Sequence, residues 1–159
     1  MKDNSTIKEK SLQPLSSVET TTATRPTVRE RTGEATEPLD DRMLGALHAA
    51  CDKKALDVVL LDLREIATFT DYFLITSGAN QRQVQAIADE VVDRLKKSGT
   101  PALRVEGYRT AEWILVDYGD FIVHVFEDKA RKFYDLERLW RESKRIELPA
   151  ELTNRQLVL

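Results

Sequence analysis

The order of apolar and polar positions divides the chain after residue 37 into predicted helices and strands. Short apolar runs at residues 57–63 and 72–76 predict two strands, and the first is apolar enough to be buried on both faces. Residues 113–126 form two further apolar runs separated by a short polar turn, which is typical of a β-hairpin. In chain order, we expect a helix over residues 38–51, strands at 57–63 and 72–76, a helix around 84–95, a short strand at 102–106, the hairpin at 113–126 and a helix over 129–143.

Particular residues indicate where the helices begin and which faces they bury. Pro38 followed by Asp40 and Asp41 is typical of a helix start. In the second helix, residues 84–95 carry an apolar stripe at three- and four-residue spacing, and Asn80 is its expected N-cap. The last helix is expected to bury one stripe of side chains, formed by Phe133, Leu136, Leu139 and Trp140.

The first strand of the hairpin has two faces of different character. Because side chains alternate along a strand, Ile114 and Val116 share one face, while Trp113, Leu115 and Asp117 share the other. The first face is wholly apolar and is expected to face the core. The second face carries a tryptophan and ends in an acid, so it either faces a partner or packs under a helix.

The predicted elements assemble into one α/β domain. The helix between the second and third strands favours a parallel crossover, whereas the hairpin is antiparallel, so we expect a small mixed β-sheet flanked by helices. Residues 1–37 contain no Phe, Tyr or Trp and six charges of each sign, which predicts a disordered tail. We place the domain at residues 38–146 and expect a loosely held C-terminal tail at residues 147–159, whose last three residues could dock.

Charge and composition narrow the choice of partners. The formal net charge is -3 and the pI is about 5.5, which argues against direct, sequence-specific nucleic-acid binding and suits a basic protein partner. No apolar run is long enough to predict a membrane span. The single cysteine, Cys51, allows no intramolecular disulfide and is predicted to be a buried, inert thiol. Without an apolar leader segment, the sequence predicts a cytoplasmic protein.

The chain offers few groups for catalysis or metal binding. The two histidines, His48 and His124, and Cys51 are too few for an ordinary zinc site, and no glycine-rich phosphate loop is present. A Ser-His-Asp set could be drawn from Ser77, His124 and Asp117, but no nucleophile-elbow sequence supports it. His124 lies mid-strand and is expected to be a hydrogen-bonded core histidine. We therefore expect no catalytic residue, no metal and no cofactor.

Nucleotidyl transfer is the enzymatic alternative. A small mixed sheet with residues 76–78 (TSG) after a strand is similar to that fold, whose reaction needs two metal ions held by closely spaced acids. Such acids usually share one face of a strand, at one-residue spacing. In the part expected to be folded, only Asp135 and Glu137 have that spacing, and they fall in a predicted helix, where their side chains diverge. The fold is thus expected to be nucleotidyltransferase-like without catalytic acids.

Three blocks of sequence carry a family resemblance. The first joins residues 55–63 (ALDVVLLDL) to residues 70–78 (TDYFLITSG), and the second is residues 82–89 (RQVQAIAD). The third runs from residue 105 (VEG) through the hairpin to residues 131–140 (RKFYDLERLW). Each block is weak alone, but in this order and spacing the chain resembles the ribosomal silencing factor family, also called the RsfS or Iojap family, over about residues 39–142.

The resemblance implies a protein without catalysis that acts on the ribosome. Family members are similar in fold to nucleotidyltransferases but lack the catalytic acids. They bind the large ribosomal subunit through an interface ribosomal protein, the fourteenth in the universal numbering, and so block joining of the small subunit when nutrients are short. Organelle relatives act in large-subunit assembly, which is the alternative function, and some members form homodimers off the ribosome.

The candidate partner-binding residues follow from the hairpin and the matched blocks. Asp117 and Tyr118 lie at a turn that requires Gly119, so turn formation is the alternative role for both. Arg82 is a cation at a helix start, where it opposes the helix dipole, so it either pairs with Asp71 or contacts a partner. The full set of candidates is Trp113, Leu115, Asp117, Tyr118, Glu106 and Arg82.

Overall fold

A six-stranded mixed sheet forms the centre of the domain. The computed structural model describes the backbone of residues 39–157 and the side chains of residues 39–153. The expected tail at residues 1–37, Pro38 and the last two residues therefore lie outside the described residues. Across the sheet the strands follow the order β3-β4-β5-β2-β1-β6. The strands are β1 (Leu56–Asp62), β2 (Tyr72–Gly78), β3 (Arg104–Glu106), β4 (Trp113–Asp117), β5 (Phe121–Glu127) and β6 (Lys144–Ile146).

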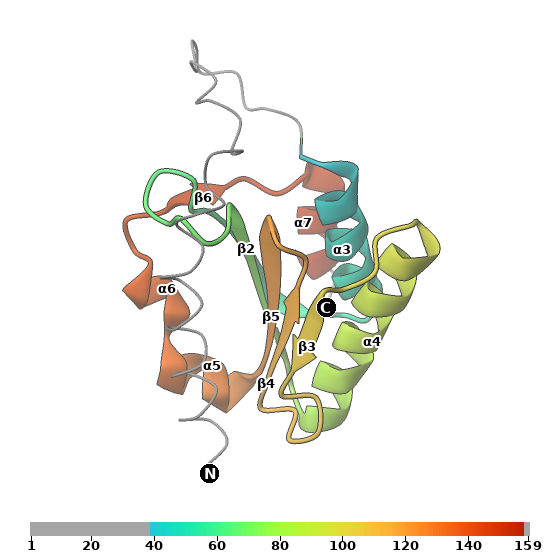
Figure 1. The fold of residues 1–159 in the computed structure, drawn as a ribbon. Coiled ribbons are helices and arrows are strands. Elements are labelled where there is room, and N and C mark those ends of the chain that lie inside the picture. Colours follow the sequence, from blue (N-terminus) through green and yellow to red (C-terminus); the bar gives the residue numbers. More distant parts are fainter. Residues whose placement is uncertain (1–38, 158–159) are drawn as a thin grey trace. The chain divides into compact units, whose positions relative to one another are not determined.

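Helices cover both faces of this sheet, with α3, α4 and α7 on one side and α5 and α6 on the other (Figure 1). β2 and β5 are parallel, whereas each other neighbouring pair is antiparallel. β3 therefore runs parallel to β2, so the predicted crossover through α4 is confirmed, and it spans β5 and β4. The α/β class is confirmed, while the likeness to nucleotidyltransferases stays a prediction. The helices are α3 (Asp41–Asp52), α4 (Gln81–Lys97), α5 (Asp128–Tyr134), α6 (Leu136–Leu139) and α7 (Ala150–Leu157).

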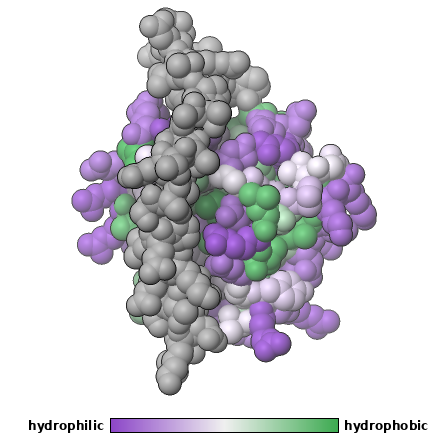
Figure 2. Space-filling model, viewed as in Figure 1, coloured by the Kyte–Doolittle hydropathy of each residue, from purple (hydrophilic) through white to green (hydrophobic). Residues whose placement is uncertain are grey.

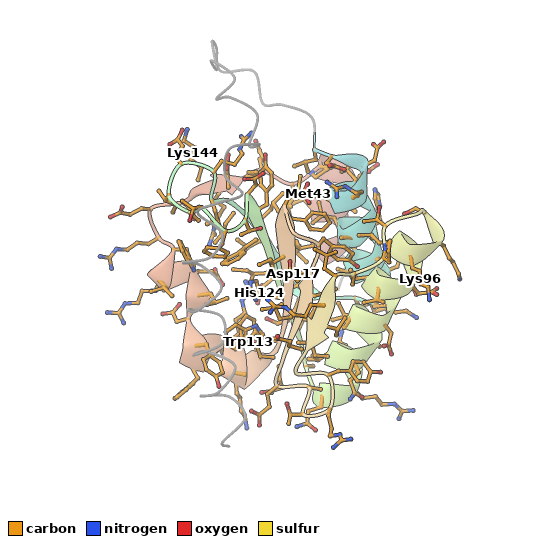
Figure 3. The ribbon with its side chains drawn as sticks, in the orientation of Figure 1. Met43, Lys96, Trp113, Asp117, His124 and Lys144 are labelled. Atoms are coloured by element: carbon orange, nitrogen blue, oxygen red, sulfur yellow. The ribbon has the colours of Figure 1, made fainter. Side chains whose placement is uncertain are left out.

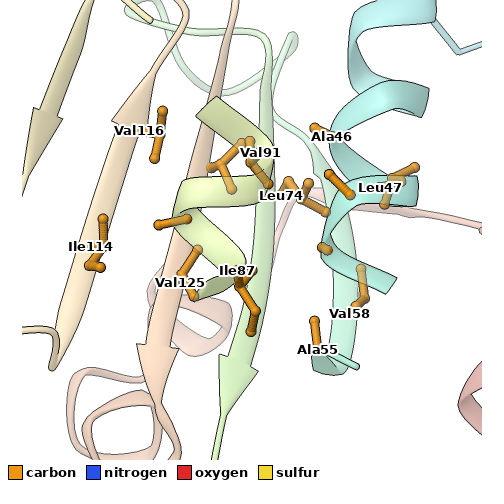
Figure 4. Close-up of a cluster of buried hydrophobic side chains, with 14 of the residues drawn as sticks. Ala46, Leu47, Ala55, Val58, Leu74, Ile87, Val91, Ile114, Val116 and Val125 are labelled. Carbon is orange, nitrogen blue, oxygen red and sulfur yellow. The ribbon is translucent and has the colours of Figure 1, made fainter. Parts of the chain in front are cut away.

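The larger apolar core lies between the sheet and the layer of α3, α4 and α7. Ile87 and Val91 from the predicted stripe of α4 pack towards Ile114 and Val116 of β4, and all four are fully buried (Figure 4). Burying an aliphatic side chain of this size contributes about 1.5–3 kcal/mol. The expected inward face of the first hairpin strand is therefore confirmed.

Polar side chains fix the starts of the two long helices. The Asp40 carboxylate accepts a hydrogen bond from the backbone N–H of Arg42 at the start of α3. At the start of α4, the Asn80 side chain accepts one from the backbone N–H of Gln83 at 2.9 Å. Each cap satisfies an N–H group that has no partner within its own helix. The predicted helix start near Asp40 and the predicted N-cap at Asn80 are both confirmed.

The prediction of one helix over residues 129–143 is wrong, because the chain forms two short helices there. Asp135 lies between α5 and α6 in the left-handed conformation, with φ 47° and ψ 55°, which interrupts the helical hydrogen bonds. The interruption changes which side chains face the sheet. Leu136 and Trp140 pack against it as expected, but Phe133 and Leu139 are 82% and 71% exposed.

The segment after β6 also differs from its prediction. We expect a loosely held tail from residue 147, but the structure has helix α7, which packs against α3 and buries Leu152 to 1% exposure. The edge strand β6 precedes it and pairs Ile146 with Leu60 of β1. Two of its three residues, Lys144 and Arg145, are charged and exposed, so its composition gives no strand signal.

Candidate partner-binding site

Five side chains gather at the sheet edge formed by β3 and β4, on the side that faces α5 and α6. Arg104 pairs with Asp117 across the two strands, and Glu106 pairs with Leu115. Directly opposed residues on antiparallel strands point to the same face, and Trp113 joins them by alternation along β4. All five are half-buried or exposed. We call Arg104, Glu106, Trp113, Leu115 and Asp117 the Trp113 surface.

Trp113 is held in place by three neighbours. Its indole Nε1–H donates a hydrogen bond to Nδ1 of His124 at 3.0 Å, and its ring stacks on Phe126 with centroids 5.0 Å apart. Tyr134 of α5 contacts the ring with centroids 4.8 Å apart. Figure 3 shows Trp113, His124 and Asp117 following one another along this part of the sheet. Trp113 therefore packs beside a helix and is still only half-buried, so the sequence alternatives are not exclusive.

A smaller apolar core, which includes Phe73 and Phe126, lies between the sheet and the layer of α5 and α6, and His124 supports Trp113 from within it. Its side chain is 3% exposed, and its imidazole ring makes a T-shaped contact with the ring of Phe73, with centroids 4.4 Å apart. Burial lowers the pKa of His124 to about 3, so the ring is neutral near pH 7. Because Nδ1 accepts from Trp113, the proton of the neutral ring lies on Nε2, which has no hydrogen-bond partner among the described residues. The prediction of a hydrogen-bonded core histidine is confirmed.

The acids of the Trp113 surface are tied to its arginine. Arg104 Nη2 lies 3.2 Å from a carboxylate oxygen of Asp117, and Arg104 Nη1 lies 3.5 Å from one of Glu106. Asp117 also accepts the backbone N–H of Gly119 at 2.8 Å, and Gly119 has φ 88°. The predicted turn role of Asp117 is therefore confirmed. With two acids and one base, the surface carries a small negative charge beside its apolar residues.

Tyr118 does not belong to this surface. Its side chain is 5% exposed and stacks on Phe121 in the larger core, with centroids 4.8 Å apart. Burial raises the pKa of its hydroxyl to about 12. The prediction of Tyr118 as a contact residue is wrong because Tyr118 follows Asp117 directly, so its side chain points to the opposite face. Asp120, on the same turn, forms an ion pair with Arg42.

Arg82 also lies apart from the Trp113 surface. It is exposed in the first turn of α4, which covers the opposite face of the sheet. Asp71 precedes β2 and Arg82 follows it, so the two residues lie at opposite ends of this strand. The predicted ion pair between them is therefore not formed. Arg82 makes no ion pair with any residue that the structure describes. It is not part of the site assembled around Trp113.

Two residues of the site were not identified from the sequence. Arg104 reaches Asp117 only through strand pairing, at a separation of 13 residues. Tyr134 reaches Trp113 because α5 folds back beside β5. An opposite charge across the β3–β4 pair could have indicated Arg104 if the pairing and its register had been known. No comparable signal marks Tyr134.

Three other features of the described residues bear on metal ions, cavities and membranes. Within residues 39–157, no three His, Cys, Asp or Glu side chains come together in a way that could hold a metal ion. An open hollow of about 760 Å³ lies beside α4 and is lined by Asp89, Val105 and Tyr108 among others. No described helix is both long and apolar enough to cross a membrane. An aromatic and an aliphatic side chain with charged neighbours, as at Trp113 and Leu115, are typical of a protein–protein interface.

The fold and this surface define a small α/β domain with a candidate docking surface at one sheet edge. Residues 36–157 match the family model described as "Ribosomal silencing factor during starvation". The chain therefore belongs to the ribosomal silencing factor family, and the resemblance predicted from its sequence blocks is confirmed.

Individual relatives agree with the family. The chain is 44% identical over 103 residues to "Ribosomal silencing factor RsfS" of Halalkalibacterium halodurans, a match that covers 65% of this chain and 88% of that protein. It is 31% identical over 91 residues to the mouse protein "Mitochondrial assembly of ribosomal large subunit protein 1", covering 55% of this chain and 40% of that protein. A crystal structure of a Bacillus halodurans protein has a TM-score of 0.62 and 42% identity, covering 68% of this chain and 98% of that one. The first of these relatives is named as a silencing factor and the second as an assembly protein.

Proposed function

We propose that this protein is a cytoplasmic translational repressor that binds the large ribosomal subunit and blocks joining of the small subunit, especially when nutrients are limited. The observation that carries the proposal is the Trp113 surface, which presents an anchored aromatic ring in a chain that belongs to the ribosomal silencing factor family. The partner within the large subunit would be a ribosomal protein at the subunit interface.

The mechanism that this proposal needs is steric. A folded domain that covers part of the subunit interface excludes the small subunit, and the two compete by mass action without any bond being made or broken. A specific protein interface of this kind buries about 1,200–2,000 Å² in total. A few anchors supply most of the binding energy, and an aromatic ring that is already fixed before binding loses little side-chain entropy.

The charge of the surface supports a basic partner. Glu106 and Asp117 flank Trp113 and Leu115, and Arg104 balances only one of the two acids. Many ribosomal proteins are basic because they bind RNA, so an acidic rim would steer such a partner towards the apolar anchors. Arg82 and Tyr118 are left out of this contact because of where the structure places them.

The test is co-sedimentation of the purified protein with isolated large subunits, at micromolar concentration. We expect the wild-type protein to pellet with the subunits and to reduce their joining with small subunits in a sucrose gradient. Trp113→Ala should weaken both effects, whereas Leu103→Ala, which removes an exposed apolar side chain before β3, should leave them unchanged. A wild-type protein that stays in the supernatant would contradict the proposal.

Assembly of the large subunit is the second candidate function. It is favoured by the relative in mouse, which is named for assembly of the mitochondrial large subunit. The same docking surface would serve either role, because an assembly factor must also bind the immature particle. Accumulation of immature large subunits in a deletion strain, without a defect in surviving starvation, would favour assembly over repression. Formation of a homodimer off the ribosome stays a prediction that size-exclusion chromatography with light scattering can check.

A further inference from the structure

The segment from the start of α5 into β6 carries a net charge opposite to that of the residues before it. Residues 128–145 contain seven Lys or Arg and four Asp or Glu, so their net charge is +3. Residues 39–127 contain ten basic and fifteen acidic residues, so their net charge is -5. The net negative charge of the whole chain therefore conceals a basic segment, which comprises α5, α6 and the start of the edge strand β6.

The outward side of α5 and α6 combines this charge with exposed apolar side chains. Ala130, Leu136 and Trp140 pack inward against the smaller core. Arg131 and Tyr134 also reach the sheet, at Ser77 and Trp113, and several of the remaining side chains are exposed. Among them, Phe133 and Leu139 are the two most exposed large apolar side chains on these helices. Figure 2 shows hydrophilic and hydrophobic side chains mixed along the edge where Figure 1 places α5 and α6. We call Lys129, Lys132, Phe133, Arg138, Leu139 and Arg141 the α5–α6 surface.

Most of the basic groups of the α5–α6 surface are available to a partner. Lys129, Arg138 and Arg141 are exposed, and none forms an ion pair with a residue in the described part of the chain. Lys132 forms only an exposed pair with Asp128, at 3.5 Å. Pairs of this kind contribute little to stability, so binding an anion could replace this one at low cost. Asp135 and Glu142 are the exposed acids nearby, and they do not cancel the excess of bases.

We propose that the α5–α6 surface binds RNA, with its arginines and lysines on phosphates and Phe133 stacked on an unpaired base. The inference deepens the proposed function and rests on it, because the large subunit presents RNA beside its interface proteins. Phosphate contacts through Lys and Arg supply affinity without reading sequence, and an exposed aromatic ring between them is a stacking platform for single-stranded bases. This contact would be independent of base sequence.

RNA fits the surface better than a membrane does. A helix that lies on a membrane buries a broad apolar face along its length. α5 and α6 have seven and four residues, and their outward side offers only Phe133 and Leu139 as large, mostly exposed apolar groups. The α5–α6 surface and the Trp113 surface lie on the same side of the sheet, and Tyr134 lies between them, in contact with both Trp113 and Phe133. One large subunit could therefore engage a protein at the first surface and RNA at the second.

The experiment measures how salt changes binding. The variant Lys129→Gln/Arg138→Gln/Arg141→Gln is compared with the control Lys53→Gln/Lys54→Gln/Lys96→Gln, which removes three exposed bases at the end of α3 and on α4. Each protein is titrated against isolated large subunits and, separately, against deproteinised large-subunit RNA, over a range of KCl concentrations. Circular dichroism checks that both variants stay folded. The variant Phe133→Ala tests stacking.

The proposal expects a selective loss for the α5–α6 variant. The slope of log affinity against log salt should become shallower by about two to three with both probes, because each lost phosphate contact removes about 0.7–0.9 from that slope. Phe133→Ala should weaken RNA binding roughly tenfold, and the control variant should match wild type. An unchanged slope on intact subunits would overturn the inference while leaving the proposed function standing.

Two other outcomes separate the possibilities. If the α5–α6 variant loses affinity for intact subunits but the wild-type protein does not bind the deproteinised RNA even at low salt, the partner is an acidic protein and the inference is overturned. If the wild-type protein binds the RNA through these residues but does not bind intact subunits, the RNA contact is supported and the proposed function fails.

Discussion

Trp113 and His124 form a hydrogen-bonded pair that lies diagonally across β4 and β5, with the indole Nε1–H 3.0 Å from the imidazole Nδ1. One partner is partly exposed and the other is buried. The orientation of a candidate anchor is therefore set by a side chain that a binding partner cannot reach. Substitutions of His124 should then affect docking indirectly, through the position of the indole ring.

Replacing Trp113 by phenylalanine should destabilise the domain by about 1–3 kcal/mol, because His124 Nδ1 loses its donor while remaining buried. The free energy of unfolding in urea measures this. Trp140→Phe is the matched control, since Trp140 packs edge-on against Phe73, with centroids 5.8 Å apart, and makes no side-chain hydrogen bond to a described residue. Equal losses for the two variants would contradict a special role of the hydrogen bond.

The buried imidazole should make the stability of the domain depend on pH. The pKa of His124 is about 3 in the folded protein and close to 6.5 when unfolded, so between these values only the unfolded chain takes up the proton. The free energy of unfolding is therefore unaffected by this titration above about pH 6.5. As the pH falls from 6.5 towards 3, the free energy of unfolding decreases by about 1.4 kcal/mol per pH unit.

His124→Gln removes this titration while keeping an oxygen that can accept from Trp113. Between pH 7 and pH 5, the wild-type protein should lose about 2 kcal/mol more unfolding free energy than the variant. The other titrating groups are common to both proteins, so they cancel in the comparison. A difference near zero would mean that His124 is protonated in the folded state as readily as in the unfolded chain.

Asp117→Asn separates the charge of this residue from its role in the turn. The amide oxygen can still accept the N–H of Gly119, so the melting temperature should change little. Binding to large subunits should weaken about three- to tenfold if a basic partner meets this edge. Asp93→Asn, on α4 and paired with Lys97, is the control that removes an acid from the opposite side. Equal binding by both variants would move the contact away from Asp117.

Arg131 should be important for holding α5 and α6 against the sheet. Its guanidinium donates to Ser77 Oγ at 2.8 Å and to a carboxylate oxygen of Glu137 at 2.9 Å, and its side chain is 11% exposed. Arg131→Ala should cost about 2–4 kcal/mol of unfolding free energy, because buried polar groups lose their partner. Lys132→Ala, which removes an exposed pair, should cost less than about 0.5 kcal/mol. Chemical denaturation of both variants tests the contrast.

Gly107 leaves no room for a side chain beside β4. A Cβ at this position would lie 2.0 Å from the carbonyl oxygen of Trp113, and φ is 78°. Gly107→Ala should therefore cost at least about 3 kcal/mol and displace the Trp113 backbone, which would also weaken subunit binding. Gly99→Ala, at φ 96° with no atom within 4 Å, should cost about 1 kcal/mol. Thermal melting measures both variants, and an equal decrease in melting temperature would contradict the steric argument.

Elements with a clear period were predictable from the sequence alone. The apolar stripe of α4 and the two faces of β4 follow from residue spacing, so both were placed correctly, including the inward Ile114 and Val116. The outward positions of Phe133 and Leu139 were not, because the phase of α5 and α6 depends on one residue in the left-handed conformation. Asp is tolerated there more readily than most residues, but Asp89 and Asp93 lie inside the regular helix α4, so an aspartate alone gives no decisive signal.

The candidate site was predictable in part for the same reason. Alternation within β4 correctly grouped Trp113, Leu115 and Asp117, since it depends only on neighbours in sequence. Arg104 joined them through strand register, which a single sequence does not specify. Tyr118 was misplaced because residues of the turn were treated as one surface, although the alternation that groups the others sends its ring into the core.

The left-handed conformation at Asp135 gives the α5–α6 segment an unusual dependence on one backbone position. A straight helix through this residue would place Phe133 and Trp140 two turns apart on one stripe and would draw the phenylalanine towards the sheet. Glycine or asparagine at position 135 would keep the bend, whereas a β-branched residue would favour the straight form and hide the ring. The backbone conformation at position 135 thus decides whether the Phe133 ring is buried or exposed. A homologue could gain or lose this exposed ring by changing residue 135 alone.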